Sequence, residues 1–180
     1  MSHQNQDSVL SQKAKSIKLV FLDVDGVLTD GTIYYSSLGE SLKPFNTLDG
    51  QGIKYLLNAG IDVAIISGRG SESLKARALD LGIKELHMNV QNKRLKAQEV
   101  LNRQQLDWTQ VAAMGDDWPD LPILNRVGFS CAPLTAHVEL RRRVHWVSQE
   151  KGGYGAVREM CDLILKSQGR YDALLLEYLT

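Results

Sequence analysis

The sequence has little of what extracellular, membrane or thiolate-metal proteins need. Its only two cysteines, Cys131 and Cys161, lie far apart without Cys-x-x-Cys or Cys/His spacing, which favours a reducing compartment over a disulfide or zinc framework. The polar residues 1–16 lack the apolar stretch of a signal peptide, and no later run approaches membrane-spanning length. Lys plus Arg and Asp plus Glu both total 21, so no net charge steers the molecule towards nucleic acid or membrane. We expect a cytoplasmic protein without a nucleic-acid or membrane partner.

What the chain does contain is enough apolar sequence for one core. With 180 residues and 43% hydrophobic composition, it has the usual size of a single domain. We see no internal repeat and no low-complexity linker. The predicted organisation is a flexible N-terminal tail (1–16), one domain (17–169) and a C-terminal tail (170–180).

Short apolar runs alternate with segments of helical period along the domain. Helix signals include Asp49 as a predicted N-cap and Gly60 and Gly82 as stops. Segments 32–35 and 41–45 flank a turn and predict a hairpin. Alternation of this kind predicts a Rossmann-like, doubly wound parallel α/β sheet, with a β-hairpin flap and no separate cap domain. The expected strands are 17–22, 61–66, 85–88, 111–114, 128–132 and 144–147, and the expected helices are 51–58, 71–81, 93–103 and 156–166.

Polar clusters follow the strands where ligands bind in an open parallel sheet, outside the carboxyl ends. Three carboxylates facing one another would repel unless a hard cation lies among them, and oxygen ligands suit Mg²⁺. A hydroxyl, an ammonium group and backbone amides would then hold a phosphoryl group. The set predicts phosphoryl transfer, and it comprises Asp23 and Asp25, Ser67-Gly68-Arg69, Lys93, and Gly115-Asp116-Asp117.

The Asp-x-Asp pair can divide the work of one reaction, because residues two apart leave a strand end on the same side. Asp23, attached to magnesium, would be the nucleophile that forms an aspartyl phosphate. Asp25 would protonate the leaving alkoxide and then deprotonate water.

These motifs resemble the four ordered motifs of the haloacid dehalogenase superfamily. They are Asp23-Val-Asp-Gly-Val-Leu-Thr-Asp30, Ile-Ile-Ser67-Gly-Arg69, Lys93 and Gly115-Asp-Asp-Trp-Pro-Asp120. The resemblance implies that Asp23 is nucleophile and metal ligand, that Asp25 is the acid/base and a ligand through its carbonyl, and that Asp116 is a metal ligand. It also implies that Ser67, Gly68 and Lys93 bind phosphate. An acid at position 25 resembles the phosphatase branch.

A closer resemblance is to one family within that superfamily, the 3-deoxy-D-manno-octulosonate 8-phosphate phosphatases of lipopolysaccharide biosynthesis. The segments that carry it are Lys43 to Lys54, the helix with Arg77, Gly115 to Pro122 and Gly152 to Glu159. It implies a magnesium-dependent homotetramer acting on a sugar acid phosphate. The substrate-binding positions that it implies, with Arg158 added as a further cation for the substrate carboxylate, are Asn46, Thr47, Leu48, Asp49, Gly50, Lys54, Arg69, Arg77, Asp120 and Arg158.

Two stretches depart from that family. Residues 89–92 read Asn-Val-Gln-Asn where the family usually shows a glycine and an acid, and Cys131 to Thr135 replaces a loop of small residues with one that contains Pro133. Either change could alter the shape of the phosphate loop or the rate.

The chain is also too short to cover its own site. Only a hairpin lies between Asp30 and Asp49, and only a helix lies between Lys93 and Val111. Since a wet site weakens electrostatic catalysis, we expect neighbouring subunits to supply the cover, through 32–45 and 152–158.

One alternative is excluded by motif order and two remain open. A response-regulator receiver domain carries its acidic pair after the first strand and its phospho-acceptor after the third, whereas here Gly-Asp-Asp comes last and the third strand lacks an Asp at its end. The chain could be a catalytically silent oligomerising domain that keeps only a metal site. It could also be a sibling phosphatase acting on the 9-phosphate of a nine-carbon (KDN or sialic acid type) sugar acid.

Overall fold

The computed structural model describes residues 3–179, and their side chains from residue 8 onwards. Six strands form one parallel sheet in the order β5-β4-β1-β6-β7-β8, and β2 and β3 form a separate antiparallel hairpin. This is the predicted doubly wound α/β sheet, and the strands are β1 (Leu19–Leu22), β2 (Tyr34–Ser36), β3 (Gly39–Leu42), β4 (Asp62–Ile66), β5 (Glu85–His87), β6 (Val111–Met114), β7 (Phe129–Ala132) and β8 (Trp146–Val147).

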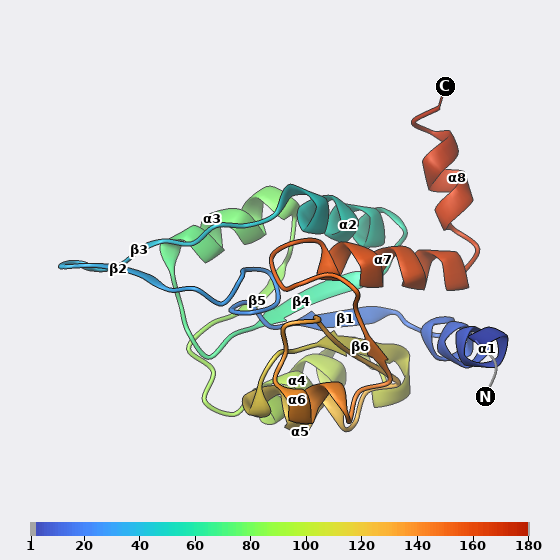
Figure 1. Cartoon of the computed structure of the whole chain (residues 1–180), viewed down its shortest axis with the longest axis horizontal. Coiled ribbons are helices and arrows are strands. Elements are labelled where there is room, and N and C mark those ends of the chain that lie inside the picture. Colours follow the sequence, from blue (N-terminus) through green and yellow to red (C-terminus); the bar gives the residue numbers. More distant parts are fainter. Residues whose placement is uncertain (1–2, 180) are drawn as a thin grey trace.

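Helices cover both faces of the sheet (Figure 1). The principal helices are α1 (His3–Ala14), α2 (Thr47–Asn58), α3 (Glu72–Leu81), α4 (Lys93–Gln104), α5 (Leu121–Leu124), α6 (Val138–Arg141), α7 (Ala156–Ser167) and α8 (Tyr171–Leu176).

The alternation of side chains along the buried strands divides the core between the two faces. On β1, Val20 and Leu22 belong to the cluster that includes α2, α3 and α7, whereas Leu19 and Phe21 belong to the cluster under α4, α5 and α6. All four side chains are almost fully buried. Strand β1 therefore lies at the centre of a three-layer sandwich, and its carboxyl end opens onto the functional site.

Helix α2 begins earlier than the sequence predicts. Its N-cap is Asn46, whose side-chain oxygen accepts from the backbone N–H groups of Leu48 (2.7 Å) and Asp49 (3.4 Å). Asp49 is buried and caps another element: its carboxylate accepts from the N–H groups of Gly155 and Arg158 at the start of α7. The prediction of Asp49 as the cap of its own helix was wrong, because its side chain is engaged by a segment more than a hundred residues away.

Helices also occupy both segments expected to be tails. Ala14 at the end of α1 is fully buried, and Tyr171 and Leu174 of α8 pack against the main core cluster. These contacts stabilise the two terminal helices. The boundaries of the domain stay a prediction. Among the described residues, no helix combines the length and apolar character needed to span a bilayer.

The hairpin formed by β2 and β3 projects from the body of the molecule (Figure 1). Its apolar side chains are exposed, with Leu38 96%, Tyr35 67% and Leu42 57% accessible. Soluble proteins rarely expose several apolar side chains on one projecting element unless a binding partner covers them.

Candidate active site

The site lies at the carboxyl ends of β1, β4 and β6, where the chain turns into loops. Asp23 follows β1, and its backbone N–H donates to the carbonyl of Met114 at the end of β6 (3.1 Å). Asp116 follows β6 after one glycine. Pairing of β1 with β6 in register, Leu22 beside Met114, thus brings two sequence-distant carboxylates to one edge.

Asp23, Asp116 and Asp120 form a compact group of acids. One carboxylate oxygen from each lies within 4.8 Å of the others. Burial raises the pKa of Asp116 to about 7, and the negative charges of Asp23, Asp120 and Asp117 add to the effect. Burial and Asp120 raise the pKa of Asp23 to about 6, against the opposing ion pair with Lys93. Clustered carboxylates whose pKa values are raised by burial and by one another suit a hard divalent cation, so the residues fit magnesium.

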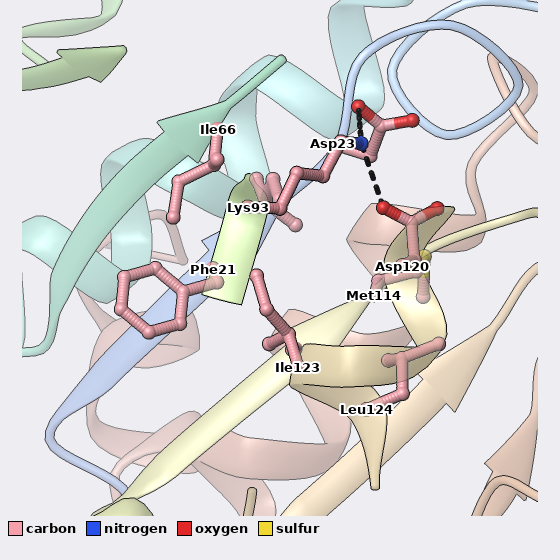
Figure 2. A pocket seen from close by; sticks show the side chains of 10 residues that line it. Phe21, Asp23, Ile66, Lys93, Met114, Asp120, Ile123 and Leu124 are labelled. Carbon is pink, nitrogen blue, oxygen red and sulfur yellow. Dashed lines mark hydrogen bonds and ion pairs between the residues drawn. The ribbon is translucent and has the colours of Figure 1, made fainter. Parts of the chain in front are cut away.

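Lys93 opens α4 and lies between two of these acids. Its Nζ is 2.7 Å from Asp23 Oδ1 and 2.7 Å from Asp120 Oδ1, and Figure 2 shows it bridging the two side chains. Burial opposes its charge, but Asp120 and Asp23 outweigh that effect and raise the pKa of Lys93. The side chains of Phe21, Ile66 and Ile123 line the floor beneath it. Lys93 is therefore a fixed cation on an apolar floor, held beside the predicted nucleophile.

Asp120 supports the group from below. Its Oδ2 accepts from the backbone N–H groups of Asp116 (3.1 Å) and Asp117 (3.4 Å), while its Oδ1 binds Lys93. The resemblance placed Asp120 among substrate contacts, whereas here both of its oxygens are used inside the site. Its geometry indicates that it orients Asp116 and Lys93.

Ser67 follows β4 and is buried at the same edge. Its backbone N–H donates to the carbonyl of His87 (2.9 Å), and its carbonyl accepts from Val90 (3.0 Å). The N–H of Arg69 donates to Ser67 Oγ (3.2 Å). Gly68 and Lys93 line one open cleft, which is a suitable entrance for a phosphoryl group.

Both asparagines of the divergent stretch 89–92 have clear local functions. Asn89 has a φ of +56°, in the left-handed region that asparagine tolerates better than most residues after glycine. Asn92 caps α4, since its side-chain oxygen accepts from the N–H of Leu95 (3.0 Å). The two asparagines therefore support the turn and the helix start that position Lys93.

Three glycines allow the backbone to pack against the nucleophile loop. A Cβ on Gly26 would lie 2.1 Å from Asp116 Oδ2, and one on Gly152 would lie 1.7 Å from the carbonyl oxygen of Gly26. A Cβ on Gly153 would lie 2.5 Å from the carbonyl carbon of Thr29. The segment at 152–153 therefore presses directly on the loop that follows Asp23, a role that the sequence did not reveal.

Most of the substrate positions implied by the resemblance make contacts within this chain. Arg77 donates to the carbonyl of Asn46 (3.1 Å) and pairs with Asp80, and a Cβ on Gly50 would meet its guanidinium at 2.1 Å. Arg158 pairs with Asp162 (2.8 Å) and lies over the ring of Tyr55. Thr47, Leu48 and Lys54 lie on α2. The substrate contacts of all these residues stay predictions. Of the four cations predicted to bind substrate, only Arg69 reaches Asp25, with its Nε 3.5 Å from Oδ2.

Sequence reasoning missed two charged residues, Glu40 on β3 and Lys43 directly after it. Lys43 pairs with Asp25, and Glu40 pairs with Arg69. Nothing in their spacing marks them, because lysine and glutamate on an isolated hairpin are usually exposed.

Comparison with known proteins finds relatives of similar sequence and solved structures of similar fold. No family model matches the sequence. The 3-deoxy-D-manno-octulosonate 8-phosphate phosphatase of Yersinia pestis is 46% identical over 161 residues, which are 89% of this chain and 86% of the relative. The crystal structure of the phosphatase of that name from Moraxella catarrhalis, in complex with magnesium ion, phosphate ion and a KDO molecule, has a TM-score of 0.92 at 37% identity and covers 98% of this chain and 99% of that chain. The cobalt-bound form of the Haemophilus influenzae enzyme has a TM-score of 0.90 at 40% identity, covering 94% and 100%.

Proposed function

The chain belongs to the family of 3-deoxy-D-manno-octulosonate 8-phosphate phosphatases in the haloacid dehalogenase superfamily, and from this membership we propose that it hydrolyses that sugar phosphate with Mg²⁺ as cofactor. The products are 3-deoxy-D-manno-octulosonate and phosphate. The observation that carries the proposal is the meeting of Asp23, Lys93, Asp116 and Asp120 at one sheet edge.

Asp23 is the nucleophile of the proposed reaction. One carboxylate oxygen forms a bond to phosphorus as the bond from phosphorus to the sugar oxygen breaks, and Asp25 gives its proton to that oxygen. Water then attacks phosphorus, Asp25 takes a proton from it, and the bond to Asp23 breaks to release phosphate. Together, the two half-reactions return both carboxyl groups to their starting states.

The remaining residues neutralise the charge of the phosphoryl group and position it. Asp23, Asp116 and the carbonyl of Asp25 would hold Mg²⁺, which when bound neutralises negative charge on the phosphoryl group. Lys93 supplies a second positive charge from its fixed place beside Asp23. The Ser67 hydroxyl and the backbone at Gly68 are placed to donate to the non-reacting oxygens. The complete set favours an enzyme over a catalytically silent domain.

Phosphate release from matched sugar phosphates tests the substrate. We expect Mg²⁺-dependent hydrolysis of the eight-carbon substrate, with kcat/KM at least about 10-fold above that of the nine-carbon 9-phosphate. Chelation should abolish release and added Mg²⁺ should restore it. Faster turnover of the nine-carbon compound would reassign the substrate, and no release from either would refute the proposed activity.

The proposal also covers where and in what assembly the protein works. We place it in the cytoplasm, in lipopolysaccharide biosynthesis, as a homotetramer. Support for the assembly comes from the exposed apolar hairpin and from Tyr154, which is 59% exposed beside the Gly152 segment. A neighbouring copy seated there would cover the site that the chain leaves open.

Charged substitutions in the hairpin should therefore lower both the mass of the assembly and the enzymatic activity. We expect Leu38→Glu combined with Leu42→Glu to give smaller species in sedimentation velocity and to lower kcat/KM about 10-fold, because buried charge disfavours an apolar interface. Leu79→Glu is the matched control, since Leu79 is 83% exposed on α3 and is not part of the hairpin. A smaller species with full activity would rule out cover by neighbouring subunits.

A further inference from the structure

A network of four charged side chains joins the hairpin to the predicted acid/base. Lys43 Nζ donates to Asp25 Oδ1 and lies 3.5 Å from Glu40 Oε1. Arg69 Nη2 donates to Glu40 Oε2 (2.8 Å), and Arg69 Nε lies 3.5 Å from Asp25 Oδ2. The two acids and two bases balance in charge, and each acid faces both bases.

Lys43 is the most buried member of this network, and Arg69 is the most exposed. The side chains of Lys43 and Glu40 are 6% and 15% exposed, although Glu40 lies on β3 of a hairpin whose tip is open to solvent and Lys43 directly follows that strand. Burying an ammonium group is costly unless it is paired and hydrogen-bonded. A hairpin could be anchored by apolar contacts at less cost, so the placement of this lysine on Asp25 calls for a functional explanation.

The two oxygens of Asp25 are not equivalent in this network. Oδ1 accepts the hydrogen bond from Lys43, whereas Oδ2 lies at ion-pair distance from Arg69 Nε, a buried atom without a hydrogen-bond partner among the described residues. Fixing Oδ1 leaves Oδ2 as the oxygen that can carry the transferred proton. Rotation of the carboxylate away from the leaving oxygen would break the bond to Lys43.

We propose that Lys43 is a positioning residue that holds the Asp25 carboxylate for proton transfer, and that Glu40 holds the Arg69 guanidinium at the same site. The proposal rests on the assigned reaction and adds two residues to it. It also connects the exposed hairpin to the chemical step, because Glu40 lies on β3 and Lys43 directly follows that strand.

The dependence on leaving-group basicity separates positioning of Asp25 from a structural role. Departure of a basic alkoxide needs a proton, whereas departure of 4-nitrophenolate does not. We therefore expect Lys43→Met to lower kcat/KM for alkyl phosphates about 10- to 100-fold and for 4-nitrophenyl phosphate less than about 3-fold. Lys75→Met, an exposed lysine paired with Glu72, is the matched control and should leave both unchanged.

A double-mutant cycle adds a second readout. Asp25→Asn should show the same selective loss, and adding Lys43→Met to it should lower kcat/KM less than about 3-fold further, because the lysine acts through that carboxylate. Lys43→Arg keeps the charge and should show the same selective loss of kcat/KM, with a smaller magnitude. It replaces Lys43→Met in the test if that variant does not fold. Glu40→Gln should raise KM for the sugar phosphate and leave the leaving-group dependence intact.

Equal losses across the ester series, or full additivity with Asp25→Asn, would overturn the proposal for Lys43. The ester series does not depend on which sugar is the substrate. Wild-type protein that cleaves the simple esters and ignores the sugar phosphate would refute the assigned substrate, and the comparison between esters would still decide the role of Lys43.

Discussion

Asp23→Asn is expected to lower phosphate release by at least about 10³-fold, because the amide cannot form the acyl phosphate. The loss should appear in kcat for both the sugar phosphate and 4-nitrophenyl phosphate, since every substrate requires the nucleophile. Asp62→Asn is the control, because Asp62 is an exposed carboxylate at the start of β4. Residual activity above about a tenth of wild type would exclude Asp23 as the nucleophile.

The same substitution should not unfold the protein. Burial and Asp120 raise the pKa of Asp23 to about 6, so in the metal-free protein the folded state favours a neutral group at this position. The sign follows from linkage: a carboxyl group with a raised folded-state pKa costs stability as the pH rises through that value. Asparagine is neutral and has nearly the same shape, and Lys93 keeps Asp120 as its partner. Metal-free Asp23→Asn should therefore unfold, above neutral pH, at a temperature no lower than that of wild type.

Gly152→Ala is expected to damage both the fold and the site. The added Cβ would lie 1.7 Å from the Gly26 carbonyl oxygen and 2.5 Å from its carbon, so backbone must shift. We expect a loss of about 2–4 kcal/mol in the free energy of unfolding, as for overpacked or strained interiors. Because Gly26 packs so closely on Asp116 that a Cβ there would lie 2.1 Å from its carboxylate oxygen, Mg²⁺ affinity should fall as well.

Gly169→Ala provides the matched control for this prediction. Gly169 has a φ of +67° but open space around its Cβ, so alanine there should cost only about 1 kcal/mol of left-handed strain. Chemical denaturation and calorimetric Mg²⁺ titration would measure both effects. If Gly152→Ala were no more harmful than Gly169→Ala, direct packing of 152–153 on the nucleophile loop would be disproved.

The sheet could be predicted because its strands satisfy simple local rules. Strands 61–66 and 111–114 were found within one residue of β4 and β6, since each is a short apolar run with a glycine signal or polar cluster at its end. The start of α2 could not be placed, because Asn46 and Asp49 are equally good caps by type and only the distant start of α7 decides between them. The helices at the two ends depend on tertiary contacts in the same way.

In the site, too, local signals could be predicted from the sequence and long-range contacts could not. The residues on loops directly after strands, Asp23 and Asp116, were predicted because parallel strands bring their ends together, and the structure brings Lys93 to them. Lys43 and Glu40 could not be predicted, because the bend of the hairpin towards Asp25 has no local signal. The close approach of Gly152 to Gly26 likewise depends on how α7 is docked.

Trapping the covalent intermediate tests the central claim most directly. Protein mixed with substrate and Mg²⁺ would be denatured rapidly and treated with borohydride, which reduces an acyl phosphate to an alcohol. Peptide mass spectrometry should then show homoserine at position 23, dependent on Mg²⁺ and absent from Asp23→Asn. Phosphate release accompanied by reduction at another residue, or at none, would contradict the assignment of Asp23 as the phosphoryl acceptor.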